Sequence, residues 1–228
     1  MVIMFAGLLS GCALGLGGSD PLDRDVLALS VPAGGSADQL GTRIQQGGYE
    51  FALLSASQDS AWLAAAAARA GLQMTRAGSV GDHNFVFFGP AALGDTTHVI
   101  TVRSGGSVRL HDALFELDNN HRLDMILARF DSITDVREGV RSLLAYIAKD
   151  VSGNVPLLLG VETPSQQFGD SVATLIRAAY LDTRECAEEV KTPSAIRLFY
   201  GPPLHVRCER ATVLNEAGGP VSAHFVLP

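Results

Sequence analysis

Short apolar runs alternate with helix-spaced apolar residues in the first part of the chain. Runs closed by Gly, Pro or Ser are typical of buried strands. Between them, Leu40 and Ile44 fall four apart and predict a helix, and Gly47 and Gly71 are helix stop signals. The expected strands are 26–31, 49–55, 72–77 and 85–88, and the expected helices are 36–46 and 59–70. The sequence therefore predicts a small β-α-β-α-β-β unit over residues 25–90.

The second part of the chain predicts an antiparallel sheet packed with two amphipathic helices. Asp118-Asn119-Asn120 separates two apolar runs and indicates a hairpin, and helix-spaced apolar stripes begin at Val136 and Phe168. The expected strands are 97–103, 107–110, 114–117, 123–130, 155–161, 195–200, 204–214 and 221–227. The last of these is either an edge strand open to a partner strand or an interior strand. We expect an α+β fold, with a boundary near residues 89–95 and a second domain over 97–228.

The first twelve residues end in Leu9-Ser10-Gly11-Cys12 after an apolar run. Such a run is too short to span a bilayer and is typical of a signal peptide. Its ending resembles the lipobox of bacterial lipoproteins. That resemblance implies cleavage after residue 11, lipidation of Cys12, and a glycine-rich tether over residues 12–24. The alternative is a buried N-terminal element in which Cys12 is a core thiol.

The chain has three cysteines. If Cys12 carries a lipid, Cys186 and Cys208 remain as one pair that an oxidising compartment could join. The alternative is two separate core thiols. Their spacing does not follow a zinc pattern.

Composition limits the classes of partner. Hydrophobic residues make up 47% and charged residues 18% of the 228 residues, as in a folded globular protein. The formal net charge of −7 argues against binding to nucleic acid, which requires a basic surface.

Gly169-Asp170-Ser171-Val172 resembles the Gly-Asp-Ser-Leu block of one esterase family. That resemblance implies Ser171 as a nucleophile whose base comes from an Asp-x-x-His motif near the C-terminus. Neither His205 nor His224 has an aspartate three residues before it. The alternative interpretation is that Asp170 and Ser171 are ordinary residues of the first turns of a helix.

Several residue types that bind metals lie close together around the expected hairpin: His111, Asp112, Asp118, His121 and Asp124. A calcium loop needs a glycine at its sharp turn, and the group has none. We interpret the group as a solvated hairpin tip, and expect no metal and no cofactor. Phe85, Phe87 and Phe88 are expected in the core.

These observations favour a lipid-anchored cell-envelope protein, facing the periplasm from the outer membrane. We expect it to act as a binding or assembly module that contacts other envelope proteins, and not as an enzyme. Two alternatives stay open: a periplasmic serine hydrolase that uses Ser171, and a cytoplasmic structural protein.

Overall fold

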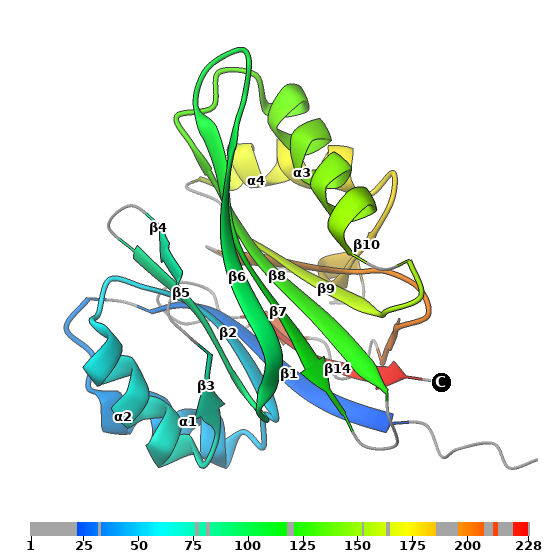
Figure 1. Ribbon diagram of the computed structural model, residues 1–228. Helices are drawn as coiled ribbons and strands as arrows, with labels where there is room; N and C mark the ends of the chain where they lie inside the picture. The colour runs from blue at the N-terminus through cyan, green and yellow to red at the C-terminus, as the bar shows by residue number, and fades with distance from the viewer. Residues whose placement is uncertain are drawn as a thin grey trace, which may run out of the picture.

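The computed structural model describes residues 22–227 except 32, 76–77, 81–82, 118–120, 152, 163–164, 186–195, 208–211 and 214–220. The described residues form two sheets packed face to face, with helices on both outer faces (Figure 1). The α+β class is confirmed. No helix in this described part of the chain is long and apolar enough to cross a membrane.

The first sheet has the strand order β12-β14-β1-β2-β5-β3, with β13 paired to β14 and β4 paired to β5. Its strands are β1 (Leu22–Val31), β2 (Phe51–Ala56), β3 (Gln73–Met74), β4 (Gly78–Val80), β5 (His83–Gly89), β12 (His205–Val206), β13 (Thr212–Val213) and β14 (Val221–Leu227). β1 and β2 run parallel, whereas β14 pairs antiparallel with β1. The final strand is therefore an interior strand of the first sheet and not an edge.

The second sheet has the order β10-β11-β9-β8-β7-β6. Its strands are β6 (Ala92–Thr101), β7 (Ser107–Glu116), β8 (Arg122–Asp131), β9 (Leu157–Glu162), β10 (Leu181–Asp182) and β11 (Ile196–Tyr200). β6, β7 and β8 form an antiparallel meander, which confirms the hairpin predicted between β7 and β8. β9 returns parallel to β8 after a helical connection.

Helices cover the outer face of each sheet. They are α1 (Ala37–Gln46), α2 (Ser60–Ala70), α3 (Val136–Asp150) and α4 (Gln166–Ile176), and a 3-10 turn, η2 (Thr183–Glu185), follows β10. Ser36 and Gln39 form a capping box at the start of α1. Asp59 caps α2, which ends at Gly71 in the left-handed conformation with φ 76°. α1 and α2 pack on the first sheet, and α3 and α4 pack on the second (Figure 1).

The main core fills the space between the sheets. Phe51 and Phe87 of the first sheet meet Phe115 of the second edge to face, at ring-centroid distances of 5.2 and 6.2 Å. Phe85, Phe87 and Phe88 are fully buried, as expected. Pro90 and Ala91 carry the chain from β5 of the first sheet to β6 of the second, while strands β12 to β14 return to the first sheet.

Candidate active site

Polar side chains replace apolar ones at one end of the space between the sheets. Leu53 and Phe85 in the first sheet, and Leu127 in the second, belong to the core between the sheets. Strand alternation places Ser55 of β2 and Arg129 of β8 on the same inward faces, two residues further along each strand. The residues that gather at this end are Ser55, His83, Arg109, Arg129, Asp131 and Glu162, called here the strand-end cluster.

Strand register brings this cluster together. Arg109 lies opposite Arg129 in the antiparallel β7–β8 pair. Glu162 lies beside Arg129 in the parallel β8–β9 pair. Two residues before Glu162, Gly160 leaves no room for a side chain, because a Cβ there would lie 2.8 Å from Leu127 Cδ1 of the neighbouring strand and 3.2 Å from Leu53 Cδ2 of the first sheet. The close packing at Gly160 therefore supports Glu162 and the rest of the cluster.

The two arginines are held by one carboxylate. Asp131 Oδ2 lies 2.7 Å from Arg109 Nε, and its Oδ1 lies 3.0 Å from Arg129 Nε. The side chains of Arg109 and Arg129 are 34% and 28% exposed, so both guanidinium groups reach solvent from fixed positions. Planar guanidinium groups held this way suit the oxygens of a phosphate or carboxylate.

A histidine–carboxylate pair lies next to the arginines. Glu162 Oε1 is 3.5 Å from His83 Nδ1, and Glu162 Oε2 is 3.8 Å from Arg129 Nη1. Burial raises the pKa of the Glu162 carboxyl, and the nearby charges of Arg129 and His83 oppose that shift. Glu162 Oε2 is buried and accepts no hydrogen bond from the described residues. A raised pKa suits a carboxyl group that exchanges protons during a reaction.

Ser55 does not have the geometry of a catalytic nucleophile. Its Oγ lies 3.1 Å from His83 Nδ1, the same ring nitrogen that faces Glu162. A serine–histidine–carboxylate relay uses the two different ring nitrogens. Ser55 is also fully buried, so its contact orients the His83 ring.

The donor set of the cluster does not fit a divalent metal centre. Its two carboxylates, Asp131 and Glu162, both face arginines. Among the residues that the structure describes, no group of three or more His, Cys, Asp and Glu side chains could hold a metal ion. Hard divalent cations need several carboxylate or carbonyl oxygens facing one point. The cluster instead offers positive charge to an anion.

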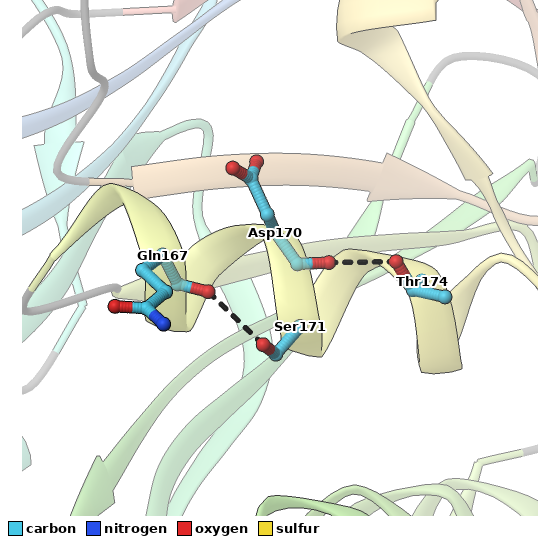
Figure 2. Close-up of a pocket in the computed structure, with 4 residues that line it drawn as sticks. All are labelled: Gln167, Asp170, Ser171 and Thr174. Atoms are coloured by element: carbon cyan, nitrogen blue, oxygen red, sulfur yellow. Dashed lines mark hydrogen bonds between the residues drawn. The ribbon is translucent and has the colours of Figure 1, made fainter.

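Ser171 does not belong to the strand-end cluster. It lies on the solvent side of α4 (Figure 2). Its Oγ donates a hydrogen bond to the carbonyl of Gln167 at 3.0 Å, within its own helix. Asp170 forms an ion pair with Arg197 of β11. His224 lies in the first sheet, where it contacts Asp25 at 2.9 Å. The esterase interpretation of residues 169–172 is therefore wrong for this fold.

The predicted group around the hairpin divides between the two faces of the second sheet. His111 is buried among core residues and stacks on Phe87 with ring centroids 5.2 Å apart. Asp112 and Asp124 share the opposite face, where the Tyr146 hydroxyl of α3 donates to Asp112 Oδ2 at 2.8 Å. Burial, followed by the nearby charge of Asp112, raises the pKa of Asp124 to about 7. This pair lies under a helix and not at a solvated tip.

Other predicted residues lie outside the described residues: Cys12, Cys186, Cys208 and Asp118. Lipidation of Cys12 and a bond between Cys186 and Cys208 stay predictions.

Solved structures share the fold of this chain. No protein-family model matches the chain, and no curated protein matches its sequence. A Bacteroides thetaiotaomicron protein of the endonuclease/exonuclease/phosphatase family matches with a TM-score of 0.72 and 11% identity, over 91% of this chain and 99% of that one. The chain has the endonuclease/exonuclease/phosphatase fold.

Two further structures carry the same fold. The mannosyl-6-phosphatase of B. thetaiotaomicron matches with a TM-score of 0.68 and 10% identity, over 90% of this chain and all of that one. The human Nocturnin catalytic domain, with bound sulfate anion, matches with a TM-score of 0.65 and 10% identity, over 92% and 97% of the two chains. The proteins of this fold include enzymes such as that phosphatase, which contradicts the expectation of a non-enzymatic envelope assembly module, and that expectation is wrong.

Sequence reasoning missed the strand-end cluster. The available signal was the polar residue that ends each buried run, such as Ser55 after Phe51–Leu54 and Glu162 after Leu157–Val161. That signal becomes specific only when the strands are known to be neighbours.

Proposed function

We propose that this protein is a phosphoester hydrolase whose active site is the strand-end cluster. The observation that carries the proposal is the pair Arg109 and Arg129, fixed by Asp131 beside the His83–Glu162 pair. The phosphatase named among proteins of this fold supports the reaction class. The cluster supplies both an anion-binding part and an acid–base part.

Arg109 and Arg129 bind the phosphoryl oxygens of the substrate in this proposal. Charge-assisted hydrogen bonds from guanidinium groups strengthen as negative charge builds on those oxygens in the transition state. Asp131 keeps both groups in place through their Nε atoms. Because the two arginines are already ordered, substrate binding does not carry the entropy cost of fixing their side chains.

His83 and Glu162 move the protons. Water attacks phosphorus while the imidazole of His83 accepts a proton from that water. The bond between phosphorus and the leaving oxygen breaks, and protonated Glu162 gives its proton to that oxygen. Because His83 Nδ1 and Glu162 Oε1 lie 3.5 Å apart, a proton can then return from the imidazolium to the carboxylate. The raised pKa of Glu162 favours the protonated form that this step needs.

The proposed substrate is a small phosphomonoester. The chain carries a net charge of −7, which disfavours the long polyanionic backbone of a nucleic acid. Two arginines match the charge of a single phosphoryl group.

The test is hydrolysis of p-nitrophenyl phosphate and of a panel of sugar phosphates by wild-type protein and site variants. We expect Glu162→Gln and His83→Asn each to lower kcat about 100-fold or more. Arg109→Gln should raise KM and lower kcat. Matched controls are Glu116→Gln and Arg122→Gln, which change exposed residues at the other ends of β7 and β8.

Two results would count against the proposal. One is wild-type protein without activity on every phosphomonoester of the panel. The other is activity that the Glu162 and His83 variants keep at the wild-type level. Because the donor set does not fit a divalent metal centre, EDTA should leave the activity unchanged.

A further inference from the structure

Among the strands that the structure describes, β6 forms one edge of the second sheet and pairs along its length only with β7. It is ten residues long and lies in the foreground of the sheet in Figure 1. In an edge strand, alternate N–H and C=O groups point away from the sheet, where they can pair with another strand. A strand of this length offers a long row of such groups.

β6 lacks most of the features that protect edge strands. Natural edges are blunted by Lys, by Pro, by short length or by a bulge. Residues 92–101 contain no Lys, Arg or Pro, and their one irregularity is the bulge between Ala92 and Gly94. At the opposite edge of the same sheet, β10 has only two residues.

The side chains of β6 expose apolar surface. Leu93 is 50% exposed and Val99 is 59% exposed. Among the described residues, the exposed large hydrophobic side chains are these two and Leu181 of β10. Two of the three therefore lie on one edge strand, six positions apart.

We propose that β6 is a pairing surface for a second copy of this chain, joined antiparallel about a two-fold axis at Thr96. Antiparallel pairing about that axis places Leu93 of each copy opposite Val99 of the other. This arrangement covers Leu93 and Val99 of both copies. It also joins the second sheet of one copy to the second sheet of the other as one continuous sheet. A contact in which the same patch serves both copies closes the assembly at two chains. This inference is independent of the proposed hydrolase activity.

The second copy is favoured over an unrelated strand because β6 is complementary to itself in this register. Thr96 meets Thr96 of the partner, and threonine pairs are favourable across strands. The strand carries one acid, Asp95, and one histidine, His98, so like charges do not accumulate at the contact.

The test is the mass of the full chain in solution, measured by light scattering and by sedimentation velocity over a concentration series. We expect a dimer in wild-type protein and a monomer in Leu93→Lys and Val99→Lys. Leu181→Lys is the matched control, because it adds the same charge at an equally exposed apolar position on the other edge. That variant should stay dimeric. Far-UV circular dichroism checks that all variants are folded.

A cysteine variant tests the register. Thr96→Cys places two thiols at the proposed axis, within the Cα separation that a disulfide needs. It should form a linked dimer on mild oxidation above the level of wild-type protein. Thr101→Cys, at the end of the strand, should not.

Three results would overturn the inference. The first is a wild-type monomer at about 100 µM, where a weak specific association is still populated. The second is a dimer that Leu93→Lys and Val99→Lys leave intact, which would assign the contact to another surface. The third is a monomer that pairs only with an added strand from another protein.

Discussion

Replacing Asp124 by Asn should make the protein more stable at alkaline pH and remove part of its pH dependence. Asp124 lies beneath α3, is 7% exposed, and neighbours Asp112. Tyr146 and Asp150 of α3 face the same region. At high pH the fold therefore holds two like charges in a partly dry space. An asparagine at residue 124 keeps a similar shape and can donate a hydrogen bond to Asp112.

The sign follows from the two pKa values of Asp124. The ordinary value is 3.8 and the folded value is about 7. Between these values the folded chain holds a proton that the unfolded chain has released. The contribution of Asp124 to stability is therefore complete below about pH 4 and is lost as the pH rises through about 7. Above about pH 7 the folded chain therefore carries the full electrostatic cost of the charged Asp124 side chain beside Asp112.

The magnitude follows from the same gap. About three pKa units at about 1.4 kcal/mol each give an upper bound of about 4 kcal/mol. Because Asp112 is only partly buried, solvent screens the interaction, so we expect about half of that, about 2 kcal/mol. Asp124→Asn should therefore raise Tm at pH 8 by about 4–8 °C.

The assay is thermal and urea unfolding at pH 5 and pH 8 of wild type, Asp124→Asn and the surface control Glu116→Gln. The difference between wild type and Asp124→Asn should be smaller at pH 5 than at pH 8, because at pH 5 only part of the stabilising protonation has been lost. Parallel pH profiles for the two proteins would refute the argument. So would an Asp124→Asn protein that is less stable than wild type at pH 8.

Three further predictions follow from the structure and the sequence. Arg197 is buried between Asp182 and Asp170, so Arg197→Gln should lower the free energy of unfolding by about 3–5 kcal/mol in urea titrations; a loss under about 1 kcal/mol would mean that the pair is solvated. Gly160→Ala should cost about 1–3 kcal/mol, because its Cβ would press on Leu127 of the same sheet and on Leu53 of the first sheet, and an unchanged midpoint would show that these two side chains can move aside. Cys12→Ser should move the protein from the membrane to the soluble fraction of its host, and equal fractionation of both forms would contradict the lipid anchor.

Local features of the fold could be predicted from the sequence because their causes are local. Ser36, Asp59 and Ser165 cap the helices that their positions indicate. The turn chemistry of residues 118–120 correctly indicated the β7–β8 hairpin. In these cases neighbours within a few residues determine the structure.

The candidate site could not be predicted because its geometry depends on distant pairings. Glu162 meets Arg129 only through the parallel β8–β9 register, and β1 meets β14 across most of the chain. In sequence, Ser55 and Glu162 look like ordinary ends of buried strands. The Gly-Asp-Ser resemblance around Ser171, kept as an alternative, could not be decided from the sequence for the same reason, since four residues do not show which face of which layer they occupy.

The central claim is that the strand-end cluster hydrolyses phosphomonoesters. The most direct measurement is phosphate release from a panel of phosphomonoesters by purified wild type, Glu162→Gln and the matched control Glu116→Gln. The account predicts activity in wild type and control, and a loss of about 100-fold or more in Glu162→Gln. Equal phosphate release by all three folded proteins, or none from any, would contradict it.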